Sequence, residues 1–465
     1  MFFHQYQLGC LSLYSYLIAD ETTGRAVVID PQRDIAGYLA DAEQHGFTIE
    51  RVIETHFHAD FLSGHLELAA ATGAVVSYGD IAVADFPIEP LAHGQRLSLG
   101  EVTLEIRHTP GHTPESISIV IFEAPDSHPW GVLTGDTLFI GDVGRPDLLT
   151  SVGRSADSLA RDLHRSLYEQ LLTLPDATRV FPAHGAGSAC GKQLSTASES
   201  TIGQQRATNY ALQPMSEDGF VTAVTEGQTV APLYFAFAAD ANRRERELLD
   251  DHEPPRILGV ADALDLAARG AVLLDTRSPE SFASGHLRGS VNVGLDGRFA
   301  EYAGDVLRPG QEVVLLGHAG TGTEAKVRLA RIGFDAVVGE VPNIEGALSE
   351  HPALADAASR LTAADIADWM REDPTLQIVD VRNPGETAAG TIPGAHNLPL
   401  ASLINQLDAL DPRRPTIVYC AGGYRSSIGA STLRANGFTT VADLVGGYGA
   451  WSGAGETCAL PVNPR

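Results

Sequence analysis

The side chains best suited to chemistry gather in one dense segment and three later motifs. They are His56, His58, Asp60 and His65 in THFHADFLSGH, His112 in TPGHT, Asp136 in TGDTLF and His184 in FPAHG. Each motif follows an apolar run typical of a strand, and ligands converge at strand ends in α/β sheets. Imidazoles and carboxylates without a thiolate suit Zn²⁺ or Fe(II). Scattered core histidines are the alternative, but four motifs in this order favour a metal site.

A second motif, VYCAGGYRSS, places Cys420 between an apolar strand run and a helical pattern that begins near Arg425. Loop amides and a helix N-terminus stabilise a thiolate, which is the nucleophilic form. The same amides can cradle a persulfide anion, and a guanidinium can bind a sulfonate or thiosulfate oxygen. We therefore predict that Cys420 and Arg425 are catalytic and that Gly422, Gly423 and Tyr424 contact substrate. A structural cysteine without chemistry is the alternative.

The C-terminal half repeats itself. Residues 273–293 match 378–398 at an offset of 105, and residues 313–334 match 417–438 at an offset of 104. A period of domain size predicts two tandem copies of one α/β domain, each with a mainly parallel sheet. The second copy opens with LTAADIADWM, in which Thr362 is the expected N-cap and Asp365 lies in the first turn.

The first copy lacks the nucleophile. In a gap-free register Leu316 stands where Cys420 stands, and Thr321 stands where Arg425 stands. His318 is nearby but cannot form a persulfide. We therefore expect an inactive domain that serves as a scaffold, a docking surface or an oligomer contact.

Length and composition set the remaining bounds. A chain of 465 residues predicts two to four domains. The internal repeat and a charged segment at 242–256 that leads into a linker divide it into three expected domains, at 1–240, 255–350 and 358–465. The net charge of -27 argues against nucleic acid and anionic membrane surfaces as partners. Four widely spaced cysteines indicate reduced thiols in a cytoplasmic protein. The N-terminal segment lacks the pattern of a signal peptide, and no apolar run approaches the ~20 residues of a membrane span.

The order and spacing of the histidine and aspartate motifs resemble the metallo-β-lactamase superfamily over about residues 1–240. The resemblance implies an αββα sandwich. The usual signature of that superfamily is HxHxDH, but Phe61 replaces its last histidine here. A phenyl ring cannot ligate a metal, so the resemblance favours one metal ion over two.

Within the superfamily, the triad His56, His112 and Asp136 resembles that of the persulfide dioxygenases. This implies one Fe(II) per chain with open positions for O2 and substrate. His58, Asp60 and His184 would then surround the ligands; the alternative is that they bind a second metal.

Two further features continue the resemblance. FIGDVGRPDLL places Arg145 and Asp147 in the Gly-Arg-x-Asp stretch that lies near the thiol-substrate site of the dioxygenases. An internal Arg–Asp pair is the equal alternative for these two residues. Cys190, in AHGAGSACGK, is expected near the substrate entrance, where it could carry a persulfide; an inert buried cysteine is its alternative.

Residues 358–460 resemble the rhodanese family. The Cys-x4-Arg loop is preceded by Asp380-x-Arg382 and by a G-x-I-P-G-A-x-N element that runs from Gly390 to Asn397. The spacing favours sulfur over phosphate, because cysteine-dependent phosphatases use Cys-x5-Arg.

The combined resemblance implies a multidomain enzyme that oxidises persulfide sulfur to sulfite. Sulfur transfer through Cys420 would then form or consume thiosulfate in sulfide detoxification. Its expected partners are glutathione persulfide or a similar thiol persulfide, O2, and sulfite or thiosulfate, and a homo-oligomer is expected. One alternative is a Zn²⁺ thioester hydrolase of the glyoxalase II type fused to a sulfurtransferase. A non-catalytic sulfur carrier with a closed structural metal site is the other.

Overall fold

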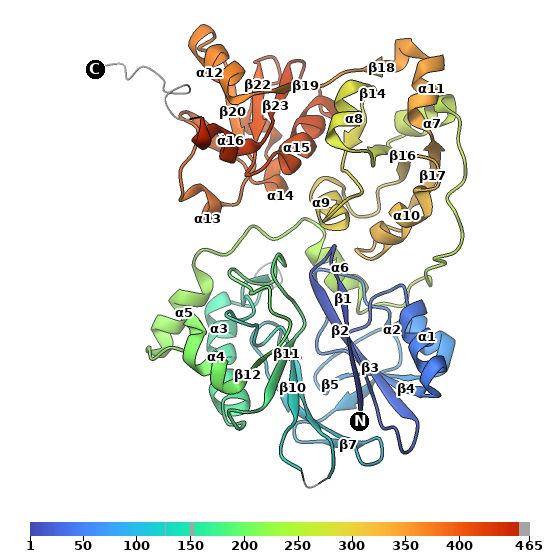
Figure 1. Ribbon diagram of the computed structural model, residues 1–465, viewed down its shortest axis with the longest axis vertical. Coiled ribbons are helices and arrows are strands. Elements are labelled where there is room, and N and C mark those ends of the chain that lie inside the picture. The colour runs from blue at the N-terminus through green and yellow to red at the C-terminus, as the bar shows by residue number, and fades with distance from the viewer. Residues whose placement is uncertain (126, 149–152, 455–465) are drawn as a thin grey trace. The chain divides into compact units, whose positions relative to one another are not determined.

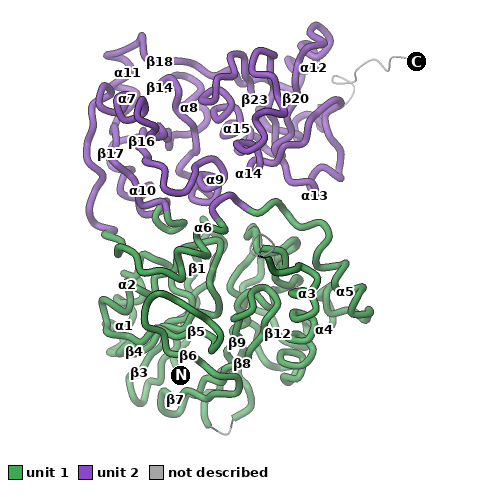
Figure 2. Tube along the Cα trace, turned by 180° about the vertical axis from the view of Figure 1, so that it is seen from behind, with its two compact units in different colours: residues 1–231, 235–250, 330–333 green, residues 232–234, 251–329, 334–465 purple. Residues whose placement is uncertain are grey.

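The computed structural model describes residues 1–125, 127–148 and 153–454, and it contains both helices and strands (Figure 1). Two compact units are distinguished in Figure 2. Unit 1 comprises Met1–Ala231, Phe235–Asp250 and Ala330–Gly333, and unit 2 comprises Pro232–Tyr234, Asp251–Leu329 and Phe334–Arg465. Among the described residues, none of the helices combines the length and apolar character that a membrane crossing requires.

Unit 1 contains two six-stranded sheets, in the orders β1-β2-β3-β4-β5-β6 and β12-β11-β10-β9-β8-β7. The first sheet consists of β1 Phe2–Leu8, β2 Leu13–Ala19, β3 Arg25–Ile29, β4 Thr48–Ile53, β5 Val75–Gly79 and β6 Glu89–Leu91. The second consists of β7 Arg96–Ser98, β8 Thr103–His108, β9 Ile117–Phe122, β10 Gly131–Gly135, β11 Arg179–Pro182 and β12 Ser200–Thr201.

The period-two alternation of β2 explains how the sheets pack. Successive side chains of a strand point to opposite faces, and every residue of β2 is buried. Tyr16 and Ile18 join a core that also holds Leu104 and Ile119 of the second sheet. On the opposite face, Leu17 joins a core that includes residues of α1 and α2. The two sheets therefore face each other across one core, and helices cover their outer faces.

The outer helices of unit 1 divide between the two sheets. The helices α1 Ala36–His45 and α2 His65–Thr72 contribute to the core of the first sheet, and α3 Ala156–Arg165 and α5 Glu217–Thr225 contribute to that of the second. A π-helical turn at Ser166–Leu171 extends α3, and the shorter α4 Ile202–Thr208 and α6 Phe235–Ala241 complete the unit. This is the αββα sandwich that the sequence predicted.

Unit 2 contains two parallel sheets, as the internal repeat predicted. One has the order β15-β13-β16-β17, and the other has the order β19-β23-β22-β20-β21. A short antiparallel pair, β14-β18, lies outside them. The strands are β13 Val272–Asp275, β14 His286–Leu287, β15 Val291–Asn292, β16 Val313–Gly317, β17 Val337–Pro342, β18 Ala355–Asp356, β19 Ser359–Leu361, β20 Gln377–Asp380, β21 Ala395–Asn397, β22 Thr416–Tyr419 and β23 Val441–Leu444.

The helices of unit 2 also repeat. The first repeat carries α7 Val260–Ala268, α8 Pro279–Ser284, α9 Phe299–Val306, α10 Gly322–Ala330 and α11 Ile344–Glu350; the second carries α12 Ala363–Glu372, α13 Pro384–Thr387, α14 Leu400–Leu403, α15 Tyr424–Ala435 and α16 Gly447–Gly453. The expected cap of α12 is confirmed, because Thr362 and Asp365 form a reciprocal capping box.

Each repeat contains the same set of contacts between an aspartate, an arginine and a glycine carbonyl. Arg277 Nη2 donates to Asp275 Oδ2 at 2.6 Å and to the carbonyl of Gly285 at 2.9 Å. In the second repeat, Arg382 Nη2 donates to Asp380 Oδ2 at 2.6 Å and to the carbonyl of Gly390 at 2.8 Å. We call these two arrangements the Asp–Arg brackets.

The sheet register corrects one detail of the sequence alignment. Asp275 pairs with Leu316 in the first repeat, and its counterpart Asp380 pairs with Tyr419 in the second. Gly317, rather than Leu316, therefore occupies the strand position of Cys420. The gap-free alignment was wrong there because the second repeat has one more residue between this strand and the glycine that follows the helix. The first repeat still presents no thiol at this position.

Candidate metal centre and cysteine loop

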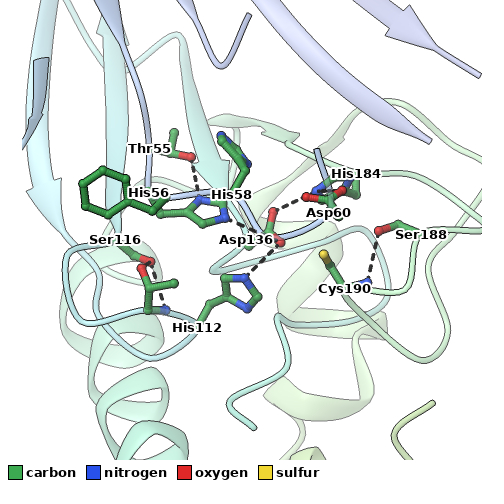
Figure 3. A network of polar contacts seen from close by, with 12 residues as sticks. Thr55, His56, His58, Asp60, His112, Ser116, Asp136, His184, Ser188 and Cys190 are labelled. Atoms are coloured by element: carbon green, nitrogen blue, oxygen red, sulfur yellow. Dashed lines mark hydrogen bonds and ion pairs between the residues drawn. The ribbon is translucent and has the colours of Figure 1, made fainter. Parts of the chain in front are cut away.

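The predicted metal-site residues lie together in unit 1 because four strands end at one edge. His56, His58 and Asp60 follow β4, His112 follows β8, Asp136 follows β10 and His184 follows β11. All six side chains are buried. Figure 3 shows His56, His112, Asp60 and His184 around Asp136, with Cys190 beside them. The sequence therefore identified which residues would meet.

The first triad is arranged around Asp136. Its Oδ2 lies 3.4 Å from His112 Nε2 and 4.0 Å from His56 Nε2. His56 Nδ1 contacts Thr55 Oγ1 at 3.0 Å, and His112 Nδ1 contacts the carbonyl oxygen of Arg145 at 2.9 Å. Such contacts on one ring nitrogen fix the tautomer and leave the other nitrogen to face a metal.

The donor set fits a divalent metal ion. Burial, reinforced by the neighbouring histidines, lowers the pKa of His56 well below its usual range, and burial lowers the pKa of His112 to about 4. Both rings are therefore neutral, which is the ligating form. Within the described part of the chain, the buried Nε2 atoms of His56 and His184 have no hydrogen-bond partner. The possible ligand atoms of His56, His112 and Asp136 all lie within 4.8 Å of one another. Atoms that bind one ion at ~2.1 Å lie a few ångströms apart in the same way.

A second group adjoins the first. The atoms that His58, Asp60 and His184 could offer to a metal all lie within 4.8 Å of one another. His184 Nε2 lies 3.3 Å from Asp60 Oδ2 and 3.4 Å from Asp136 Oδ1, so the two groups meet at Asp136. Phe61 is buried and its ring centroid lies 4.3 Å from that of His58, where it offers only apolar contact.

Two carboxylates that the sequence did not single out hold His58. Its Nε2 lies 3.0 Å from Asp30 Oδ1 and 3.3 Å from Glu54 Oε2. Burial lowers the pKa of His58, but these carboxylates outweigh it and raise that pKa well above its usual range. Glu54 also faces His65 at 3.5 Å, which gives His65 a structural partner. The sequence signal for Asp30 and Glu54 was weak, because each is a single acidic residue after an apolar run, at the ends of β3 and β4.

Cys190 reaches the same centre. Its sulfur belongs to a cluster with Asp136 and His184 whose possible ligand atoms all lie within 4.8 Å of one another. Burial and the carboxylates of Asp60 and Asp136 raise the pKa of its thiol well above the usual range. Cys10, Cys190 and Cys420 are all free in the described residues, and Cys458 lies outside them.

Arg145 forms internal contacts. Its Nε and Nη2 donate to the two oxygens of Asp147 at 2.7 and 2.9 Å, and its remaining contacts include the carbonyls of Ala189 at 3.0 Å and Thr229 at 2.8 Å. The side chain is only 2% exposed. The internal pair is therefore present, while contact with a thiol substrate stays a prediction. Arg145 also supplies the carbonyl that orients His112.

The preceding residue, Gly144, explains how this loop approaches the metal centre so closely. A Cβ atom at that position would lie 1.8 Å from the carbonyl oxygen of Asp136. Only glycine allows the two backbone segments to meet there.

In unit 2, Cys420 directly follows β22, and α15 begins four residues later. The backbone N–H of Gly423 donates to Cys420 Sγ at 3.0 Å. Gly423 has φ 102°, a left-handed conformation that turns its amide toward the sulfur. The cysteine is 2% exposed. One loop amide therefore faces the cysteine just before the N-terminus of α15, and contact with further loop amides stays a prediction.

Arg425 has a partner that the sequence did not reveal. Its Nη1 and Nη2 donate to the two carboxylate oxygens of Glu386 at 2.7 and 2.6 Å. The only local signal for Glu386 was its place in the capping box of α13, where it accepts from the backbone N–H of Asn383. Direct binding of a substrate anion by Arg425 stays a prediction.

Comparisons with known proteins place these sites in families. Residues 8–184 match the Metallo-beta-lactamase superfamily, and residues 260–350 and 362–454 each match the Rhodanese-like domain. The chain is 30% identical over 235 residues to the mitochondrial persulfide dioxygenase ETHE1 of Bos taurus, a match covering 50% of this chain and 83% of that protein. It is 32% identical over 173 residues to the cytoplasmic hydroxyacylglutathione hydrolase of Arabidopsis thaliana, covering 37% of this chain and 63% of that protein.

A solved structure resembles more of the chain. The crystal structure of a metallo-β-lactamase from Staphylococcus aureus superposes with a TM-score of 0.66 at 32% identity, covering 74% of this chain and 99% of that chain. The chain therefore belongs to the metallo-β-lactamase superfamily, carries two rhodanese-like domains after its metallo-β-lactamase domain, and has proteins named persulfide dioxygenase among its relatives.

Proposed function

We propose that this protein is a non-haem Fe(II) persulfide dioxygenase with one iron per chain, coupled to sulfur transfer through Cys420. The single observation that carries the proposal is the buried triad of His56, His112 and Asp136, a 2-His-1-carboxylate set. The relative named persulfide dioxygenase supports the same activity. The proposed overall reaction converts a persulfide anion, O2 and water into a thiol, sulfite and one proton.

Fe(II) bound by this triad would supply adjacent positions for O2 and for the outer sulfur of the persulfide. The protein orients the ligands through Thr55 and the Arg145 carbonyl, and its buried walls exclude bulk water. His184 Nε2 and the carboxylate of Asp60, 3.3 Å apart, can hold the proton that the released thiolate takes up. His58, which contacts Asp30 and Glu54, packs beside Asp60 and His184 and keeps them in position.

At the second site, the thiolate of Cys420 attacks a sulfane sulfur, and the bond from that sulfur to its donor breaks. Cys420 then carries a persulfide that the loop of Gly422 and Gly423 cradles. Sulfite attack on the outer sulfur forms thiosulfate and returns the thiolate. The reverse direction, in which thiosulfate loads Cys420, uses the same bonds.

The substrates and setting follow from this chemistry. We propose glutathione persulfide or a similar thiol persulfide as the sulfur donor, with Arg145 and Asp147 near its carrier and Arg425 near the transferred group. A role in sulfide and persulfide detoxification, a cytoplasmic location and a homo-oligomeric state belong to the same proposal.

A second candidate is a Zn²⁺ thioester hydrolase of the glyoxalase II type joined to the sulfurtransferase. Two observations favour it. One relative is named hydroxyacylglutathione hydrolase, and His58, Asp60 and His184 lie where a second ion could bind. Phe61 opposes it, because the last histidine of the dinuclear signature is missing.

The deciding experiment measures bound metal and oxygen uptake together, on protein purified without oxygen and supplied with glutathione persulfide. We expect iron at about one per chain, O2 consumption, and sulfite or thiosulfate as the product. Zinc at one or two per chain, no oxygen uptake and hydrolysis of a glutathione thioester would instead establish the second candidate.

The role of Cys190 can be tested in the same assay. If Cys190 carries a persulfide beside the iron, Cys190→Ser should keep the iron content and lower the rate of oxygen uptake about tenfold or more. Mass spectrometry of the wild-type protein after anaerobic loading should find the added sulfur on the Cys190 peptide. An unchanged rate together with a lower melting temperature would assign Cys190 to the core.

A further inference from the structure

The hydroxyl of Tyr424, the first residue of α15, is bound by the backbone of the first repeat. It donates to the carbonyl oxygen of Gly294 at 2.6 Å and lies 3.1 Å from that of Asp296. The ring of Tyr302 meets the ring of Tyr424 edge-on, with their centroids 5.4 Å apart. The side chain of Tyr424, which directly follows Gly423 of the cysteine loop, therefore contacts the repeat that lacks a cysteine in its loop.

The contact continues along one face of α15. Ser427 Oγ donates to Asn292 Oδ1 at 3.1 Å, and the backbone N–H of Asn292 donates to Ser431 Oγ at 2.9 Å. Tyr424, Ser427 and Ser431 have the spacing i, i+3, i+7, which places them on one side of a helix. Because both repeats belong to unit 2, these bonds form one continuous seam between them.

The seam is connected to the sulfur of Cys420 through the backbone of Gly423. Gly423, whose N–H donates to Cys420 Sγ at 3.0 Å, directly precedes Tyr424. Restraint of the Tyr424 side chain therefore restrains the amide that faces the sulfur. Ser427 and Ser431 lie farther along the helix and contact no atom of the loop through the bonds described above. Tyr424 is thus the member of the seam best placed to influence the nucleophile.

We infer that the first rhodanese-like repeat positions the cysteine loop of the second through Tyr424. Tyr424 is then a positioning residue, because its hydroxyl donates to a backbone carbonyl of the first repeat. The inference rests on the proposed sulfur transfer at Cys420 for its biological meaning. The effect of Tyr424 on the reactivity of Cys420 can be measured separately from sulfur transfer.

The test compares Tyr424→Phe with wild type in two assays on the full-length protein. The first is the alkylation rate of Cys420 by iodoacetamide at pH 7, followed on the Cys420 peptide by mass spectrometry. The second is kcat/KM for thiosulfate in transfer to cyanide. We expect both to fall by the same factor, about fivefold, which corresponds to one typical hydrogen bond.

Ser427→Ala is the matched control, because it removes a bond of the same seam one helical turn from the loop. We expect it to lower the melting temperature about as much as Tyr424→Phe and to leave both rates within about twofold of wild type. Tyr302→Ala, a change within the first repeat, should slow alkylation of Cys420 although it removes no atom of the second repeat.

The other outcomes are distinct. If Tyr424→Phe lowers kcat/KM and leaves alkylation unchanged, Tyr424 contacts substrate and the inference fails. If neither rate falls, the seam is packing alone, and the inference also fails. A wild-type protein that transfers no sulfur contradicts the proposed function, while the alkylation rates still decide whether Tyr424 positions the loop.

Discussion

Replacement of Cys420 by serine is expected to abolish transfer of sulfane sulfur from thiosulfate to cyanide. The loss should exceed about 1,000-fold, because the covalent route requires a thiolate that serine cannot supply. The surrounding cradle should persist, since the Gly423 N–H can donate to a hydroxyl as it does to the sulfur. Oxygen uptake with glutathione persulfide should stay within about twofold of wild type, because the metal centre lies in unit 1.

The product of that uptake gives a second readout. With Cys420→Ser the oxidised product should be sulfite, whereas wild type should also form thiosulfate. Cys458→Ser, which removes a thiol outside the described residues, is the control and should behave like wild type. Normal thiocyanate formation by Cys420→Ser would contradict the assignment of the nucleophile.

Asp136→Ala is expected to remove iron and oxygen uptake together. Asp136 is the only carboxylate of the triad and lies 3.4 Å from both His112 Nε2 and His184 Nε2. Loss of a residue outside the ligand set typically weakens metal binding about 10–100-fold, so loss of a ligand should weaken it more. Metal analysis should find iron well below one per chain, while transfer from thiosulfate to cyanide continues.

Asp60→Asn is the matched control, since Asp60 is also a buried aspartate of the centre. If the first triad alone binds the ion, this variant should retain about one iron per chain and lose part of its rate. Equal loss of metal in both variants would show that the ion depends on both groups, and the mononuclear interpretation would then be wrong.

Much of the fold was predictable because its signals are periodic or repeated. The fully buried β2 alternates between two cores, and the repeat at an offset of 105 corresponds to two similar parallel sheets. The alignment around Gly317 was less predictable, because a one-residue difference in a loop leaves no mark on the hydrophobic pattern. Hydrogen bonds between strands determine that register, and they are not visible in the sequence.

The residues of the two candidate sites also divide into those that the sequence predicted and those that it did not. His56, His112 and Asp136 were found because they lie in compact motifs that end strands. The groups that support the residues of the two sites were missed, because tertiary packing brings them together from distant parts of the sequence. Asp30 is a lone acid after β3, and Glu386 lies 39 residues before the Arg425 that it binds. For the same reason the sequence could not show that the first repeat binds Tyr424.

The Asp–Arg brackets bear on how other sequences are interpreted. Asp275 with Arg277 and Asp380 with Arg382 have nearly the same geometry, although only the second pair belongs to a repeat with a cysteine in its loop. Each bracket fastens a strand end to the glycine that follows the next helix, so it maintains the architecture whether or not a nucleophile is present. An Asp-x-Arg element found alone in a new sequence is therefore a marker of this scaffold and gives no information about turnover. The two repeats differ instead at the end of the neighbouring strand, where the second repeat has Cys420 and the first has Gly317.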